Sequence, residues 1–124
     1  MSWFSKSSNT LPHGWKSMSS EEDWMSILEL SQTEPVAIFK HSTRCSISFS
    51  AQRLLEAQWG DLDNAPKFFH LDLIAHRQLS NDIARHTGVA HQSPQLLLIF
   101  QNQVLYQASH GSINAADMAG ALPQ

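Results

Sequence analysis

The sequence contains a single cysteine, Cys45, and this scarcity excludes several kinds of protein. A lone cysteine cannot form a disulfide within the chain, so the fold has no internal cross-link and an oxidising compartment is not implied. The usual cysteine-rich zinc sites are excluded too, and the seven scattered histidines form no H-x-x-x-H pair beside an acid. We therefore expect no bound metal or other cofactor. Any redox cycle at Cys45 must be completed by a thiol from another molecule.

Positive charge and long apolar runs are also scarce. Eight Lys and Arg stand against eleven Asp and Glu, so the chain lacks the basic surface with which proteins bind duplex nucleic acid. No apolar run approaches the roughly 20 residues of a membrane-spanning helix. Residues 1–20 lack the continuous apolar block of a secretory signal. We expect a cytoplasmic protein with neither nucleic acid nor a membrane as its partner.

The apolar content predicts one folded domain. Hydrophobic residues make up 42% of the 124 residues, which excludes a disordered chain and is enough to form a core. The Ser-rich start of the sequence predicts a flexible arm over residues 1–14. A single domain over residues 15–124 follows it.

Hydrophobic periodicity predicts alternating helices and strands after the arm. Ser19 and Glu22 match a capping box, and the helix that they begin is expected to end near Gln32. A second helix follows Cys45 and ends at Gly60, a residue typical of helix C-termini. The other elements are strands at 36–39, 68–74, 95–100 and 104–108, and helices at about 79–87 and 112–121.

The order of these elements predicts the fold class. Two strand–helix units followed by a β-hairpin and a last helix give a mixed sheet with helices on both faces. We predict an α/β fold of the thioredoxin-like type, with a four-stranded mixed sheet and an extra N-terminal helix.

Cys45 is the strongest candidate for a catalytic residue. It follows a short apolar strand and a polar loop, 40–44, and begins the next helix. Free N–H groups at a helix start favour a thiolate over a thiol, and Lys40 and Arg44 add positive charge to the loop. The alternative is a buried structural cysteine, which is the common fate of a lone cysteine. The polar residues on both sides of Cys45 favour the reactive interpretation.

Two further residues suit disulfide exchange. Ser48 stands three positions after Cys45, where a dithiol enzyme has its second, resolving cysteine, so the pattern predicts a monothiol mechanism. Pro94 precedes a long apolar strand, where a proline is tolerated because it lacks an N–H group. In the predicted fold, a cis Ser93–Pro94 bond would turn the preceding backbone toward the Cys45 loop.

Other polar residues carry weaker signals. His41 or His91 can assist proton transfer to a leaving thiolate, although each is also an ordinary loop histidine. Asp72, in an otherwise apolar segment, is expected to cap the end of its strand or to pair with Arg77. Ser80-Asn81 matches a helix-capping pair.

Four segments together resemble a known family. Residues 39–48, with the sequence FKHSTRCSIS, resemble the active-site segment of the monothiol bacilliredoxins, the redox proteins of the bacillithiol system. Asp72-Leu73-Ile74, Arg77 and residues 80–84 resemble that family's middle segment. Residues 88–95 resemble the loop before its third strand, and Ala108-Ser109-His110 with Ile113 its C-terminal end. The resemblance covers about residues 15–122, with the motifs in the family's order.

The resemblance implies a thioredoxin-like fold and a role in thiol–disulfide exchange. Cys45 matches the family's nucleophile and Pro94 its cis-proline. The implied partners are S-thiolated client proteins, with bacillithiol or a similar low-molecular-weight thiol as co-substrate. The residues expected to contact the substrate are Thr43, Arg44, Ser46, Ser48, Ser93 and Pro94. Ser46 is a departure, because the family typically has a proline directly after the cysteine, where it stiffens the first helical turn.

Three alternatives remain at this stage. A non-catalytic adaptor of the same fold would use the Pro94 region to bind partners. A cluster carrier would hold a [2Fe–2S] group between two copies of Cys45 and small thiols. A cysteine hydrolase would need an oriented histidine. We expect a monomer, because the sequence has no exposed apolar heptad.

Overall fold

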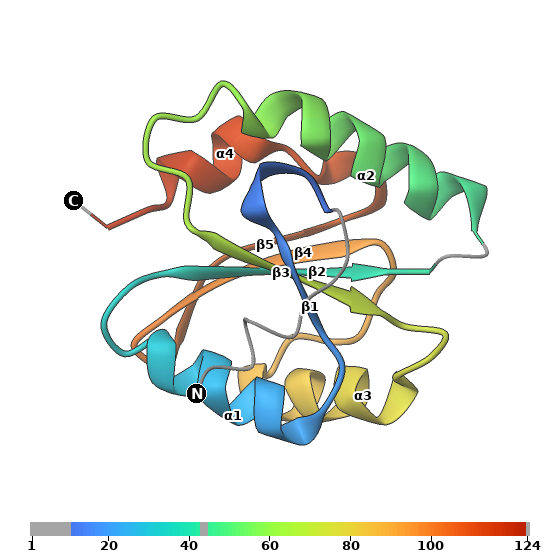
Figure 1. The fold of residues 1–124 in the computed structure, drawn as a ribbon, viewed down its shortest axis with the longest axis vertical. Coiled ribbons are helices and arrows are strands. Elements are labelled where there is room, and N and C mark those ends of the chain that lie inside the picture. The colour runs from blue at the N-terminus through green and yellow to red at the C-terminus, as the bar shows by residue number, and fades with distance from the viewer. Residues whose placement is uncertain (1–10, 43–44, 124) are drawn as a thin grey trace.

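The structure, a computed structural model, describes residues 11–42 and 45–123. A central sheet separates two layers of helices, with α2 and α4 on one face and α1 and α3 on the other (Figure 1). The elements in chain order are η2 (Pro12–Gly14), β1 (Lys16–Met18), α1 (Glu21–Leu30), β2 (Val36–His41), α2 (Ser46–Trp59), β3 (Lys67–Asp72), α3 (Arg77–Thr87), β4 (Gln95–Phe100), β5 (Gln103–Ser109), η3 (His110–Ser112) and α4 (Ala115–Gly120).

The strands form one mixed sheet in the order β1-β3-β2-β4-β5. β1, β3 and β2 run parallel, whereas β4 is antiparallel to β2 and to β5. The prediction of four strands is corrected to five, because β1 adds a three-residue edge strand beside β3. A segment this short shows no hydrophobic periodicity, so the sequence pattern did not indicate it.

Each face of the sheet has its own hydrophobic core. Alternate residues of a strand point to opposite faces, so β2 and β4 supply side chains to both cores. Phe39 and Leu96 pack under α2 and α4, whereas Ile38 and Leu97 pack over α1 and α3. Trp15, directly before β1, is 2% exposed and stacks on another aromatic ring at the sheet edge.

The first helix is capped one residue later than predicted. Ser20 is the N-cap, and its hydroxyl accepts a hydrogen bond from the Asp23 N–H at 3.1 Å. In return the Asp23 carboxylate accepts one from the Ser19 N–H at 2.8 Å. Two adjacent serines followed by adjacent acids satisfy the capping pattern in either register.

The third helix also differs from its prediction. α3 begins at Arg77, with His76 as an N-cap that makes no side-chain capping bond. Ser80 and Asn81 lie inside the helix, so the prediction that they form a capping pair was wrong. Because no side-chain cap marks its start, no local pattern indicated the first turn of this helix.

The predicted N-terminal arm lies outside the described residues as far as residue 10. The remainder of that arm, residues 11–14, contacts the domain: Leu11 packs against the core under α2. His13 Nε2 lies 2.8 Å from the Glu56 carbonyl oxygen.

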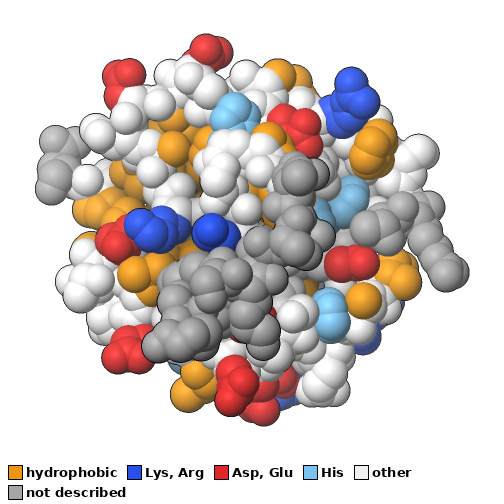
Figure 2. All heavy atoms as spheres, in the orientation of Figure 1, with side chains coloured by type: hydrophobic (Ala, Val, Ile, Leu, Met, Phe, Trp, Pro, Cys, Tyr) orange, Lys and Arg blue, Asp and Glu red, His pale blue; other side chains and the backbone are white. Residues whose placement is uncertain are grey.

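Charge is mixed on the described surface. On the face shown in Figure 2, acidic and basic side chains are interspersed with apolar and neutral ones, without a broad basic patch among the described residues. Within the same part of the chain, no helix has the length and apolarity needed to cross a membrane.

Candidate active site

The register of the sheet brings two loops together. Lys40 pairs with Gln95 in the antiparallel β2–β4 ladder, so the next positions place His41 beside Pro94. The last residue of β2 therefore lies beside the Ser93–Pro94 peptide. That peptide bond is cis, as expected from the fold, and the Pro94 carbonyl accepts a hydrogen bond from the His110 N–H at 3.0 Å.

Cys45 stands at the start of α2, where the sequence placed it. It is the N-cap residue, and its half-buried thiol is free. Its N–H donates to the Ser42 carbonyl at 3.2 Å, and its carbonyl accepts from the Phe49 N–H at 3.0 Å. The thiol therefore lies at the end of the helix where backbone N–H groups have no partner within the helix.

Ser48 holds the loop that leads to Cys45. Its side chain is fully buried, and its hydroxyl accepts a hydrogen bond from the Ser42 N–H at 3.0 Å. The same hydroxyl lies 2.8 Å from His41 Nδ1. The position that a resolving cysteine would occupy thus carries a structural hydroxyl that joins β2, the loop and α2.

Lys40 and His41 correct one part of the sequence interpretation. They are the last two residues of β2, not loop residues, and both are buried. They point to opposite faces of the sheet, as successive strand residues do. His41 faces α2 and Lys40 faces α3, so the positive charge expected in the loop from Lys40 lies within the domain instead.

Two buried histidines, His41 and His70, lie under α2. Burial lowers the pKa of His41, which favours the neutral ring that exchanges a hydrogen bond with Ser48. The His70 ring centroid lies 5.1 Å from that of His41, and burial and this neighbour lower the pKa of His70 to about 4. Gln52 of α2 accepts from His70 Nε2 at 3.1 Å when that nitrogen carries the proton. Both rings are therefore neutral near pH 7.

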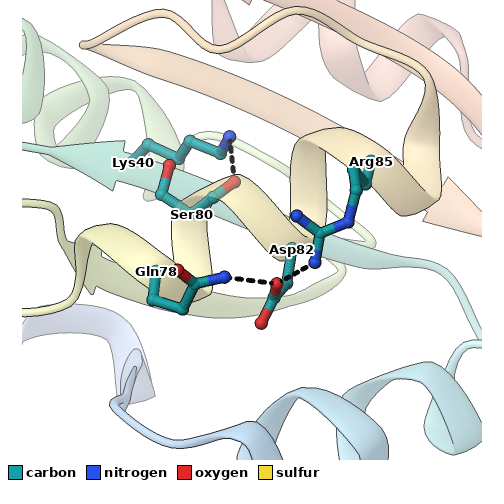
Figure 3. Close-up of polar contacts among 5 residues, drawn as sticks. All are labelled: Lys40, Gln78, Ser80, Asp82 and Arg85. Atoms are coloured by element: carbon teal, nitrogen blue, oxygen red, sulfur yellow. Dashed lines mark hydrogen bonds and ion pairs between the residues drawn. The ribbon is translucent and has the colours of Figure 1, made fainter.

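On the opposite face, Lys40 reaches α3. Its ammonium donates to the Ser80 carbonyl at 3.2 Å, as Figure 3 shows. Burial lowers the pKa of Lys40 to about 8. The Ser80 hydroxyl lies 2.9 Å from His91 Nδ1 in the segment that leads to Pro94.

The other predicted contact residues have different environments. Thr43 and Arg44 lie outside the described residues. Ser46 is exposed at the first position of α2, and Ser93 is half-buried before the cis bond. Asp72 ends β3 and accepts a hydrogen bond from the Ile74 N–H at 3.1 Å, which agrees with the strand-capping alternative.

Two exposed apolar side chains lie at the same end of the domain as the thiol. Phe49, one helical turn after Cys45, is 52% exposed, and Ile74, in the loop after β3, is 46% exposed. In the part of the chain that the structure describes, no group of three or more His, Cys, Asp and Glu side chains could hold a metal ion.

Sequence reasoning missed the buried contacts of Lys40, His41 and Ser80. A Lys-His pair directly before a polar stretch resembles a loop by composition alone. The continuation of the strand ladder beyond Phe39 was the missing signal, and it depends on partners in β3 and β4.

Comparisons with known proteins identify the family and the fold. Residues 16–118 match a family described as monothiol bacilliredoxin BrxC. A solved structure described as a candidate oxidoreductase with a thioredoxin fold is 26% identical, with 98% of each chain covered and a TM-score of 0.75.

Two thioredoxins show the same fold at lower identity. The thioredoxin NaTrxh from Nicotiana alata is 16% identical, with 91% of this chain and 93% of that chain covered and a TM-score of 0.67. The thioredoxin from Trypanosoma brucei brucei is 13% identical, with 86% of each chain covered and a TM-score of 0.64. The thioredoxin-like fold predicted from the sequence is confirmed, and fold and family together support a thiol redox role. The chain belongs to the monothiol bacilliredoxin family.

Proposed function

We propose that this protein removes bacillithiol, or a similar low-molecular-weight thiol, from mixed disulfides on protein cysteines. The observation that carries the proposal is the arrangement at the start of α2. Cys45 is the N-cap, and the position of a resolving thiol holds the buried Ser48 hydroxyl. The sequence has no second cysteine, so the exchange must proceed through one protein thiol.

The first step transfers the small thiol to Cys45. The Cys45 thiolate attacks the small thiol's sulfur in the client disulfide, and the sulfur–sulfur bond to the client breaks. The client cysteine leaves as a thiolate and takes a proton from solvent. Cys45 now carries the small thiol as a mixed disulfide.

The second step regenerates the enzyme. A second molecule of the small thiol, as its thiolate, attacks the small thiol's sulfur in that mixed disulfide and releases the Cys45 thiolate. The product is the symmetric disulfide of the small thiol. A separate reductase supplies the two electrons that return it to two thiols, so the client is reduced and the small thiol is the reductant.

The residues around Cys45 suit these steps. The N–H groups at the start of α2 stabilise negative charge on sulfur, both before attack and when Cys45 leaves. The Ser93–Pro94 peptide lies beside the last residue of β2, in the strand that leads to Cys45, where it can contact the client backbone. Exposed Phe49 and Ile74 offer apolar contacts around the modified cysteine.

The proposal is tested by intact-mass analysis. Reduced protein is mixed with a cysteine peptide that carries bacillithiol as a mixed disulfide. We expect the protein to gain the mass of one bacillithiol and to lose it when free bacillithiol is added.

The matched variants are Cys45→Ser, which we expect to form no adduct, and Ser50→Ala, at an exposed position of α2, which we expect to form it like the wild type. A wild type that stays unmodified while the peptide keeps its bacillithiol would favour the adaptor alternative.

A further inference from the structure

A cluster of polar side chains is buried between the sheet and α3. We call Lys40, Ser80, His91 and Gln95 the Lys40 cluster. Lys40 and Ser80 are fully buried and Gln95 is 1% exposed, whereas His91 is half-buried. The exchange chemistry does not use this cluster, because it lies on the face of the sheet opposite to Ser48 and His41.

Each member contacts another or the segment before Pro94. Lys40 pairs with Gln95 across the β2–β4 ladder and donates to the Ser80 carbonyl at 3.2 Å (Figure 3). The Ser80 hydroxyl lies 2.9 Å from His91 Nδ1. The Gln95 amide donates to the Ala90 carbonyl at 3.0 Å. Residues 90–95 are therefore tied to both β2 and α3.

Burying these polar groups in the core costs free energy. A buried ammonium and a buried amide lose hydration, and the side-chain oxygen of Gln95 has no hydrogen-bond partner. Apolar side chains of similar volume would commonly pack here with equal or greater stability. Burial lowers the pKa of Lys40 to about 8, which shows the same cost to its charged form. The cluster is therefore better explained by a role in holding the segment before Pro94 than by a contribution to stability.

The segment that it positions ends at the proposed client-binding peptide. Ser93 and Pro94 follow directly after His91, and the β2–β4 register places them beside Ser42 and His41. If the loop from Ala90 to Pro94 shifts, the backbone beside the end of β2 shifts with it, whereas Ser42 and His41 stay bonded to the Ser48 hydroxyl on the other face. The two halves of the site are thus held separately.

We propose that the Lys40 cluster is a positioning device that fixes the 90–94 loop for a polypeptide substrate. It gives the enzyme its preference for protein disulfides over small disulfides. This inference rests on the proposed exchange function and adds the group that selects its substrate class. A polypeptide needs the loop backbone as a docking edge, whereas a small disulfide needs only access to Cys45.

The test compares two disulfide probes in Lys40→Met. One probe is a peptide carrying bacillithiol, and the other is the mixed disulfide of bacillithiol with 2-mercaptoethanol. We expect kcat/KM for the peptide to fall at least tenfold, mainly through KM, and that for the small probe to stay within twofold. The melting temperature should stay equal to or above that of the wild type, since the variant removes a buried charge.

Two more variants make the comparison specific. Lys67→Met makes the same substitution at an exposed lysine paired with Glu34, and we expect it to leave both probes within twofold. Ser80→Ala removes the hydroxyl beside His91 but keeps the carbonyl that Lys40 contacts. We expect a loss of about threefold with the peptide alone. Equal losses with both probes, or no loss in Lys40→Met, would overturn the proposal.

NMR spectra separate this inference from the exchange function. In Lys40→Met the backbone amide signals of residues 90–93 should shift or broaden relative to the wild type, with those of α2 unchanged. Unchanged signals in 90–93 would refute the positioning role, even if the wild type is active. A wild type inactive on both probes would instead refute the exchange function and, with it, the substrate preference.

Discussion

Replacing Ser48 with alanine removes one buried oxygen atom and leaves two hydrogen-bonding groups behind. The Ser42 N–H, in a half-buried loop, can recover part of its bond from water. Nδ1 of His41 is less accessible, since that residue is 3% exposed. A lost partner costs about 1–3 kcal/mol per buried group, so we expect Ser48→Ala to lower the free energy of unfolding by about 2–4 kcal/mol.

Urea unfolding of the reduced protein measures this loss. The matched control is Ser46→Ala, the same substitution at an exposed position two residues earlier, for which we expect a change below about 0.5 kcal/mol. Adduct formation should persist in Ser48→Ala under conditions where it is folded, because the hydroxyl takes no part in the exchange. Equal stability of the two variants would refute the structural role of Ser48.

Two further predictions concern stability. The pKa of His70, lowered to about 4 from 6.5, means that the unfolded chain binds this proton more readily, so stability should fall as the pH drops from 6.5 to 4. Urea unfolding across that range should give a flatter pH dependence in His70→Gln, and identical slopes would contradict the prediction. Ser20→Ala should cost about 1 kcal/mol through the lost N-cap, and Ser19→Ala clearly less. Equal losses in these two variants would argue against Ser20 as the cap.

Local patterns predicted the parts of the fold that are locally determined. The apolar run 95–100 and the helix that ends at Gly60 are both present, because each is specified by its own residues. Cys45 was placed correctly for the same reason, since it stands between a strand and a helix with clear periodicity. The cis bond before Pro94 was expected only through the fold, as no local feature distinguishes it.

The features that the sequence did not predict depend on contacts between segments that are distant along the chain. β1 is a strand because β3 offers it an edge, and three residues carry no period of their own. The bond between His41 and Ser48 crosses a strand, a loop and a helix, so no fixed spacing indicates it. Lys40 is buried because α3 presents a carbonyl to its ammonium. Burial of polar residues of this kind is decided by tertiary partners rather than by hydropathy.

The end of β2 carries two separate anchors. Lys40 contacts the Ser80 carbonyl of α3 on one side of the sheet, and His41 contacts the Ser48 hydroxyl of α2 on the other. Because each anchor lies on its own face of the sheet, a local opening can release one of them while the other stays in place. The choice of substrate and the reactivity of the cysteine can therefore change independently of each other. A substitution under α3 can alter which disulfides the protein accepts without altering the nucleophile.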